Sequence, residues 1–419
     1  MKASRKFLRL TPLAALLAAG SAFATDGYFP IGYGMKAMGM GGASVALSDD
    51  AFAGANNPAA SAWAGNRIEG GLSAFMPKRG MSRTGGMLDA AVDSDSNLFL
   101  IPEIGYNKAV NDKIGLGITV YGNGGMNTNY DGGQLNCGQG PANVLCGGGR
   151  LGMDLMQLIV APTVAYKIND KHSFGVSPLL VYQQFKAFGL QAFSPMSQDP
   201  GHLTDQGYSR STGLGVRLGY MGKLTDSVSV GASYSPKIKM GKLDKYAGLF
   251  AGGGSFDIPE NYAMGLSFKV TPKVQLALDY ERINYAGVPS IANPSTNMAP
   301  LGSAGGPGFG WLNANVWKLG AQWEAMPGLT LRAGYNKTDN PVQSRDVSFN
   351  IIAPGVVTTH FTLGGTYALS PSMELTVAYA HARENSVTGP SMFNSQMPAG
   401  NETIRMHQNS LGVQVGWRF

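Results

Sequence analysis

The sequence contains few cysteines, few charged residues and no long hydrophobic segment beyond its N-terminus. Of its 419 residues only two are Cys and five are His, and 14% are Asp, Glu, Lys or Arg. After residue 24 no apolar run reaches about 18 residues, so we expect no transmembrane helix. Two thiols without nearby His residues also argue against a zinc site, and we expect neither a metal nor a cofactor.

The first 24 residues have the pattern of a secretory signal peptide. Four Lys and Arg residues precede an apolar core at residues 10–20, and Ala22-Phe23-Ala24 matches a cleavage site. Because the segment holds four cations and no anions, its removal lowers the formal net charge from +6 to +2. No basic block then remains, so nucleic acid is not an expected partner. The mature chain would begin at Thr25.

Cys137 and Cys146 lie in a loop rich in Gly and Asn, with eight residues between them. In an exported chain a disulfide that closes this short loop is expected.

The sequence has no Gly-x-Ser-x-Gly motif, and its scattered His residues belong to no local catalytic motif. We therefore expect no enzyme. The alternative is a lipolytic outer-membrane enzyme that pairs a Ser with one of these His residues.

Much of the chain consists of segments in which apolar and polar residues alternate. At the C-terminus the apolar positions all fall on one face of a strand: Leu411, Val413, Val415, Trp417 and Phe419. Fourteen such segments can be counted in the sequence. They lie near residues 66–76, 97–110, 113–123, 151–168, 171–191, 207–222, 225–238, 255–270, 273–286, 310–325, 328–338, 355–370, 372–383 and 407–419.

The connections between these segments alternate strictly between short and long. Six are tight turns, near residues 111, 169, 225, 271, 326 and 370, and the seven between them are much longer. An even number of strands with short turns at one end is typical of an antiparallel transmembrane β-barrel. Because lipid offers no water to unpaired backbone groups, such a sheet must close. We predict an all-β fold, with residues 66–419 as the barrel and both termini in the periplasm.

Aromatic residues and the last residue support a membrane location. Trp311, Trp317, Trp323 and Trp417 fall near predicted strand ends, where aromatic girdles meet the membrane interfaces. The terminal Phe419 resembles the C-terminal signature that the barrel-assembly machinery recognises. Expected partners are therefore that machinery, outer-membrane lipid and lipopolysaccharide, and we expect a monomer.

Residues 25–65 have no strand pattern, yet their composition is not that of a disordered segment. They are rich in Gly, Ala and Met and hold few charges. A barrel of fourteen strands encloses more space than its own side chains fill, so we expect this segment to enter the lumen as a plug, or hatch. An apolar hatch and apolar loops argue against a general porin for polar solutes.

The stretch TDGYFPIGYGMKAMGMGGASVALSDDAFAGANNPAAS, together with the barrel pattern behind it, resembles the FadL/TodX family of outer-membrane transporters for hydrophobic compounds. The resemblance covers the whole mature chain, and the family's Asn-Pro-Ala hatch motif matches Asn57, Pro58 and Ala59. It implies a passive channel in the outer membrane of a Gram-negative bacterium. Long-chain fatty acids are the expected substrates, and aromatic hydrocarbons are the alternative.

The motif residues also have separate physical roles. Pro58 fixes its own φ, Asn57 can hold a tight turn through its side chain, and the small Ala59 permits close packing against a wall.

The resemblance further implies a kinked strand that opens sideways, which we place at Gly122, Gly124 and Gly125. The alternative for these glycines is a flexible start to the loop that holds the cysteines.

Two other groups of residues are candidates for contact with substrate. Leu243, Tyr246, Leu249 and Phe250 form one apolar face of a loop, and an exposed apolar face usually marks a binding surface. The alternative is that these loops pack on one another to cap the barrel. Among the charges expected to face the lumen, Arg217, Lys318 and Arg332 are candidates to receive a fatty-acid carboxylate.

Overall fold

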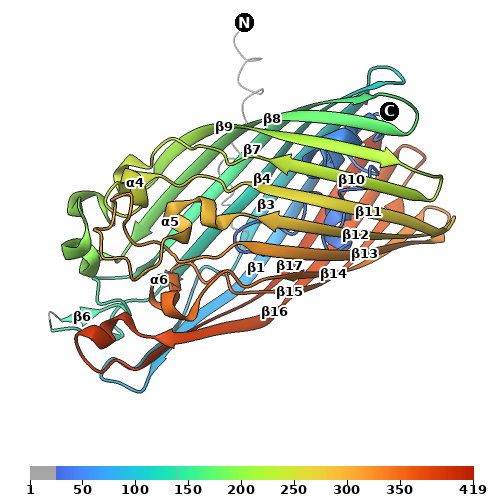
Figure 1. The fold of residues 1–419 in the computed structure, drawn as a ribbon. Coiled ribbons are helices and arrows are strands. Elements are labelled where there is room, and N and C mark those ends of the chain that lie inside the picture. Colours follow the sequence, from blue (N-terminus) through green and yellow to red (C-terminus); the bar gives the residue numbers. More distant parts are fainter. Residues whose placement is uncertain (1–24, 139) are drawn as a thin grey trace, which may run out of the picture.

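The computed structural model describes residues 25–138 and 140–419, and the expected signal peptide at residues 1–24 lies outside them. Within these residues the chain forms an antiparallel sheet that closes on itself, because β1 (Arg67–Thr84) pairs with β17 (Asn401–Arg418) (Figure 1). In the described part of the chain no helix is both long and apolar enough to span a membrane.

Fourteen strands form the wall, and each pairs with its neighbours in the chain, which confirms the predicted barrel. Between β1 and β17 the wall strands are β3 (Phe99–Ala109), β4 (Ile114–Tyr130), β7 (Leu151–Lys167), β8 (His172–Phe188), β9 (Ser209–Lys223), β10 (Val228–Ser235), β11 (Asn261–Thr271), β12 (Val274–Ile283), β13 (Ala314–Met326), β14 (Leu329–Thr338), β15 (Thr359–Ala368) and β16 (Met373–Pro390). Short β2 (Ala90–Asp93) adds a fifteenth strand that pairs only with β1.

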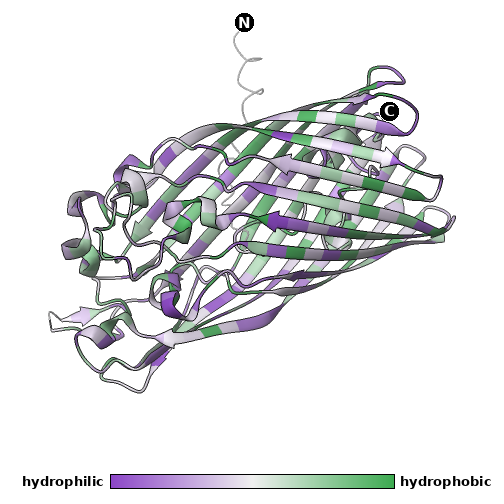
Figure 2. Ribbon diagram, viewed as in Figure 1, coloured by the Kyte–Doolittle hydropathy of each residue, from purple (hydrophilic) through white to green (hydrophobic). Residues whose placement is uncertain are grey.

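The two faces of the wall differ as the alternation predicts. In β17 the side chains of Leu411, Val413 and Val415 are exposed on the outside, whereas Ser410 and Gln414 are buried inside. Figure 2 shows the same exchange of hydrophobic and hydrophilic positions along the strands. The outer apolar face suits contact with lipid, and the backbone of the wall is satisfied by pairing between strands.

The two ends of the barrel are different. At one end, which we call the turn end, six tight connections join the strands, and the C-terminus lies there too (Figure 1). At the other, the loop end, seven long connections carry short elements: the hairpin β5 (Leu135–Asn136) and β6 (Pro141–Ala142), η3 (Gln191–Met196), η4 (Pro200–His202), η5 (Asp244–Tyr246), α4 (Ala251–Gly254), η6 (Tyr285–Gly287), α5 (Pro289–Ala292), η7 (Ser344–Asp346), α6 (Val347–Asn350) and η8 (Met392–Ser395).

Several strands extend further toward the loop end than the sequence pattern predicts. We expected the first strand to end near Met76, but β1 continues to Thr84 and pairs with β17 over its whole length. Beyond Met76 the outward positions are Lys78, Gly80 and Ser82, so the apolar alternation stops there. Pairing between backbones does not need apolar side chains, and the wall therefore continues where its outer face becomes polar.

One predicted girdle residue has a different position. Trp311 is 1% exposed and lies inside the barrel, where its Nε1 donates to Asn350 Oδ1 at 2.6 Å. In contrast, Trp317, Trp323 and Trp417 are about half exposed on the outside. Trp311 precedes β13 and belongs to a loop that turns inward, so its assignment to the girdle was wrong.

Residues 25–65, the hatch, lie inside the barrel toward the turn end (Figure 1). They contain α2 (Met35–Gly39), α3 (Ala53–Asn56) and η2 (Pro58–Ala62), and nearly all of their side chains are buried. Such short helical turns gain little stability on their own. Their conformation is therefore maintained by contact with the wall.

Close contact between hatch and wall depends on glycines that face the lumen. A Cβ atom on Gly219 of β9 would come within 2.8 Å of Pro58 Cδ and even closer to Asn57 Oδ1. Gly175 of β8 faces the Pro58 carbonyl carbon, and Gly231 of β10 faces the Val45 carbonyl, with no space for a side chain. Further around the wall, Gly320 of β13, Gly334 of β14 and Gly364 of β15 face residues 39–41 in the same way.

We predict that Gly219→Val will leave the barrel folded but displace the hatch. Valine suits a strand, whereas its side chain overlaps the hatch turn and overpacking costs about 1–3 kcal/mol. Heat-modifiable migration in detergent gels reports barrel folding, and protease cleavage within residues 25–65 reports hatch displacement. The control is Gly70→Val, since Gly70 has no neighbour within 4 Å of an added Cβ. Equal protease protection in the two variants would contradict the prediction.

Candidate functional site

An apolar pocket lies among the loops at the loop end. Its cavity volume is about 40 Å³, it is partly open to solvent, and several loops and β8 contribute to it. Its walls are formed by Leu145, Phe185, Leu190, Phe193, Leu249, Phe250, Ser290, Leu301, Pro307, Gly308, Phe309, Phe349 and Ile352. The Phe185 and Phe250 rings are 4.6 Å apart, and those of Phe193 and Phe349 5.6 Å. The apolar lining suits a hydrophobic small molecule, but the cavity is small, so the loop side chains must move when a long ligand binds.

The expected docking residues divide into two pairs. Leu249 and Phe250 line the pocket, whereas Leu243 and Tyr246 are fully buried behind it. The Tyr246 hydroxyl donates to the Gly207 carbonyl at 2.7 Å, and its ring lies 4.8 Å from that of Phe185. Leu243 and Tyr246 therefore support the pocket wall and do not present a docking surface.

A disulfide closes the loop that supplies another side of the pocket. Cys137 and Cys146 are bonded to each other, and Leu145 beside them contributes to the lining. Asn143 holds the same loop, because its Oδ1 accepts from the Leu145 amide at 2.9 Å and its Nδ2 donates to the Gly189 carbonyl at 2.9 Å. Sequence reasoning missed Leu145 as a pocket residue, since its position depends on these contacts.

An aromatic cluster adjoins the pocket on the side of the hatch, and one of its rings belongs to the hatch. Tyr28 lies 5.6 Å from Tyr285, 6.2 Å from Phe256 and 6.3 Å from Trp311, measured between ring centroids. Phe256 lies 5.0 Å from Phe250, which connects this cluster to the pocket. Tyr28 thus occupies the position directly below the floor of the pocket.

Polar contacts hold the start of the hatch in this position. The Tyr285 hydroxyl donates to the Asp26 carbonyl and accepts from the Tyr28 amide at 3.2 Å. Asp26 belongs to the hatch and not to a membrane-spanning strand, and its burial raises the pKa of its carboxyl to about 7. Lys318 lowers this pKa and Glu281 raises it, but burial has the larger effect.

Two neighbouring wall strands, β3 and β4, are paired over only part of their length, and we call the unpaired part the seam. The two strands pair only up to Ile104 and Val120, whereas β4 continues to Tyr130 and pairs there with β7 alone among the wall strands. The register between β4 and β7 shifts between Gly122 and Gly124, which places a bulge at the predicted glycines. The lateral opening itself stays a prediction.

The hatch contacts β4 directly at this bulge. The Gly125 amide donates to the Tyr28 carbonyl at 3.4 Å, and a Cβ on Gly124 would collide with that carbonyl. The Tyr33 hydroxyl donates to Asn123 Oδ1 at 3.1 Å, and its ring lies 4.1 Å from that of Tyr121. One short segment of the hatch therefore contacts both the pocket floor and the seam.

The three predicted lumen cations lie against the hatch and do not line the outer pocket. Lys318 Nζ is 2.6 Å from Glu281 and donates to the Ile31 carbonyl at 2.8 Å. Arg332 lies 3.4 Å from Asp49, and Arg217 donates to Ser235 Oγ at 3.0 Å beneath the ring of Tyr33. These contacts assign them a structural role. In residues 25–138 and 140–419 no group of three or more His, Cys, Asp or Glu is placed to hold a metal.

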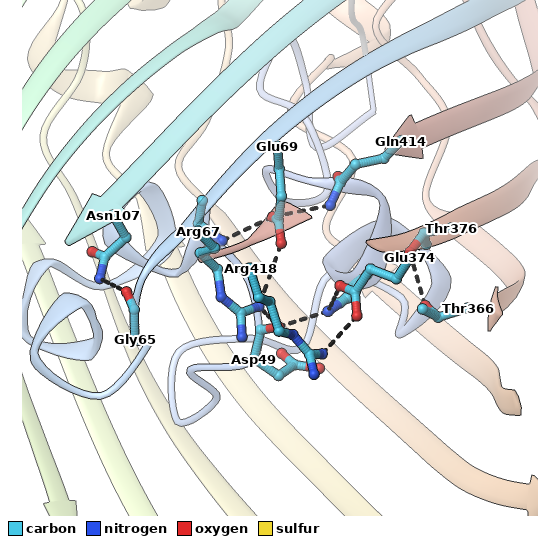
Figure 3. Close-up of polar contacts among 12 residues, drawn as sticks. Asp49, Gly65, Arg67, Glu69, Asn107, Thr366, Glu374, Thr376, Gln414 and Arg418 are labelled. Atoms are coloured by element: carbon cyan, nitrogen blue, oxygen red, sulfur yellow. Dashed lines mark hydrogen bonds and ion pairs between the residues drawn. The ribbon is translucent and has the colours of Figure 1, made fainter. Parts of the chain in front are cut away.

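Near the turn end a network of charges joins the hatch to the wall (Figure 3). Lys36 of α2 is 2.7 Å from Glu374 of β16, which also pairs with Arg418 at 2.6 Å. Glu69 of β1 accepts from the Ala51 amide at 2.8 Å and lies 3.3 Å from Arg67. Breaking one partner of a buried pair costs about 3–5 kcal/mol, so this network opposes movement of the central hatch.

The Asn-Pro-Ala motif forms a separate contact with the wall. Asn57 Nδ2 donates to the carbonyls of Val45 and Tyr220, both at 2.8 Å, and Oδ1 accepts from the Ala59 amide at 3.1 Å. Asn57 thus caps η2 while it joins two parts of the hatch to β9. Pro58 takes the first helical position, where the missing amide hydrogen has no cost.

Comparison with known proteins gives a family and a fold. The family model described as outer membrane protein transport protein (OMPP1/FadL/TodX) matches residues 13–419. Comparison with the sequences of curated proteins gave no match. Among solved structures, the P. putida toluene transporter TodX has a TM-score of 0.66 at 18% identity, and the match covers 93% of this chain and 99% of that one.

Two further structures have the same fold. A Pseudomonas aeruginosa FadL homologue has a TM-score of 0.69 at 14% identity, and the match covers 94% of this chain and 100% of the homologue. The Ralstonia pickettii toluene transporter TbuX has a TM-score of 0.63 at 18% identity, covering 93% and 98%. At these identities the likeness concerns the fold alone.

We predict that Asn57→Ala will leave the barrel assembled and make the channel more permeable. The change leaves two carbonyl groups without their donor, at a cost of about 1–3 kcal/mol to hatch docking. Asn57→Asp should behave similarly, because it keeps the capping oxygen but loses both donated bonds. Uptake of a hydrophobic dye by whole cells measures permeability. Loss of the heat-modifiable barrel in either variant would show that the turn is needed for assembly and would refute this gating role.

A second prediction concerns pH. An undocked Asp26 titrates near its ordinary value of 3.8, whereas the docked group titrates near 7. Between these values the docked hatch binds one more proton than the undocked hatch, so docking weakens as pH rises from about 4 to about 7 and changes little above that. Methyl NMR of the hatch methionines in micelles measures the docked fraction. Asp26→Asn should abolish most of this pH dependence, and an unchanged dependence would contradict the prediction.

Proposed function

This chain belongs to the OMPP1/FadL/TodX family of outer membrane transport proteins, and from this premise we propose that it carries long-chain fatty acids passively through the outer membrane. Members of this family transport hydrophobic compounds. The observation that supports the proposal is the continuous series of aromatic contacts from the pocket, through Phe250 and Phe256, to Tyr28 of the hatch.

Capture takes place at the outer pocket. The loop end faces outward from the cell, and an apolar molecule gains free energy when it leaves water for the rings of Phe185, Phe193 and Phe250. Burial contributes about 25 cal/mol per Å² of apolar surface, so a long alkyl chain binds more tightly than a short one. The pocket therefore concentrates long, apolar substrates beside the lumen.

Passage requires the start of the hatch to move. Tyr28 lies beneath the pocket and also contacts the bulge in β4, so its displacement would free both positions together. The charge network at Lys36 and Glu374 resists movement of the central hatch. We therefore assign the movement to the first residues of the hatch, and the exit to the seam between β3 and β4. Diffusion down the concentration gradient supplies the driving force.

Uptake of aromatic hydrocarbons is the second candidate function. The lining of the outer pocket is rich in phenylalanine, and offset or edge-to-face contacts between rings favour an aromatic ligand. Such a ligand needs the apolar path but no cation, whereas a fatty acid also benefits from a positive charge near that path. The two functions therefore differ in what they require beyond the pocket.

Growth of a strain that lacks its own transporter separates these functions. We predict that the protein restores growth on oleate and does not restore growth on an aromatic hydrocarbon such as toluene. The reverse result would favour the second candidate. Rescue on neither substrate would refute transport, and labelling of the protein by a covalent serine probe would instead support an enzyme.

A pocket variant connects this result to the structure. Phe250→Arg puts a charge into the apolar pocket, which disfavours an alkyl chain, and we expect oleate uptake to fall at least tenfold. The control is Met298→Arg, because Met298 is exposed and does not line the pocket. If both variants support uptake at the rate of the unaltered protein, capture does not occur at this pocket.

A further inference from the structure

We propose that Arg79 receives the carboxylate of the substrate at the seam between β3 and β4. This inference rests on the proposed function and names the residue that distinguishes an acid from a neutral hydrocarbon. Arg79 lies in β1 on the lumen side of the wall and is only 5% exposed. It was not among the cations that the sequence suggested.

Arg79 is a buried cation with incomplete contacts. Its Nη1 donates to the Asn127 carbonyl, while Nε and Nη2, both buried, have no hydrogen-bond partner among the residues that the structure describes. Its guanidinium carbon lies 5.7 Å from the centre of the Phe99 ring. Burial of a charge without a counter-ion is costly, so a carboxylate that approaches these nitrogens gains a strong interaction.

Several other buried cations of the lumen already have carboxylate partners. Arg83, four residues further along β1 and on the same face, lies 2.6 Å from Glu402. Lys36 and Lys318 pair with Glu374 and Glu281. Arg217, which pairs with no carboxylate in the described residues, is contacted by Ser235, the Ala55 carbonyl and Tyr121. Arg79 is therefore the better receptor for an anion that comes from outside the protein.

The acidic residues near Arg79 are engaged elsewhere. Asp93 of β2 pairs with Arg405, and Asp95 pairs with Arg150, both in exposed positions at the loop end. Tyr130, the nearest titratable group on β4, donates its hydroxyl to the Ile351 carbonyl at 2.9 Å. None of these three side chains makes a hydrogen bond or an ion pair to Arg79 within the described residues.

Arg79 also lies where a substrate would leave the lumen through the proposed exit between β3 and β4. Its partner Asn127 lies on the part of β4 that no longer pairs with β3, and Phe99 is the first residue of β3. The side chain thus reaches from β1 across the inner side of the seam. The main hydrophobic cluster of the lumen includes buried apolar side chains from both sides of the seam, such as Ile101 of β3 and Met126 of β4.

These features define the chemical class of the ligand. A planar guanidinium with two unpaired nitrogens matches the two oxygens of a carboxylate, and the apolar surroundings accept an alkyl chain. The ligand is therefore an amphipathic carboxylic acid such as a long-chain fatty acid. A neutral hydrocarbon could pass the same seam but would gain nothing from Arg79.

Binding to purified full-length protein in micelles tests the proposal, with laurate and the neutral dodecanol of equal chain length as probes. We expect Arg79→Gln to weaken laurate binding at least tenfold and to change dodecanol binding less than twofold, and Arg79→Lys to fall between. The control Arg282→Gln removes an arginine of β12 that contacts Asn284 and Asn315, and it should bind both probes like the unaltered protein.

A measurement on the unaltered protein covers the case in which the variants fail to fold. The carboxyl group of bound ¹³C-labelled laurate should stay ionised to a lower pH than in free micelles, because a nearby cation favours the charged form. An unshifted titration, or equal effects of Arg79→Gln on both probes, would overturn the inference and leave the proposed function intact. Binding of neither probe by the unaltered protein would overturn both.

Discussion

The need to satisfy every backbone hydrogen bond within a lipid membrane is the constraint on which the rest of this structure depends. A sheet in hydrocarbon cannot leave an edge unpaired, so β1 and β17 must meet. Closure creates a lumen too wide for the wall's own side chains to fill. The hatch occupies that space, and wall glycines such as Gly219 and Gly231 let its backbone approach closely. The seam between β3 and β4 is the place where pairing is relaxed, and the hatch contacts it.

The central part of the hatch makes stronger contacts with the wall than its first residues do. This difference supports a mechanism in which the first residues move. Its central part is fixed by buried ion pairs such as Lys36–Glu374 and by the two bonds that Asn57 donates. Its first residues rely on ring contacts of Tyr28 and on hydrogen bonds around Tyr285. Ring contacts are worth about 0.5–1.5 kcal/mol each, much less than a buried ion pair costs to break. Movement is therefore expected at the start of the hatch, which contacts both pocket and seam.

The sequence predicted those parts of the molecule whose structure depends on neighbouring residues in the chain. Alternation along segments such as residues 407–419 predicted the wall, and turn chemistry predicted its tight end. The positions of Trp311 and Arg79 could not be obtained in this way, because each depends on contacts with distant segments: Asn350 for one and Asn127 for the other. The same holds for Arg217, Lys318 and Arg332, whose partners in the hatch are far away in the sequence. The alternation of residues along a strand shows which face a side chain occupies. It does not show which residue of a distant segment that side chain contacts.

The most direct test of this account is to locate a bound substrate. A crystal structure with a bromine-labelled long-chain fatty acid would show the bromine by anomalous scattering. The account predicts bromine peaks beside Phe250 and Phe256 and at the seam between β3 and β4, with Tyr28 displaced from its present position. A second pocket, which Leu47 and Lys223 help to line, lies at the turn end. Bromine peaks confined to that pocket, with Tyr28 unmoved, would contradict the account.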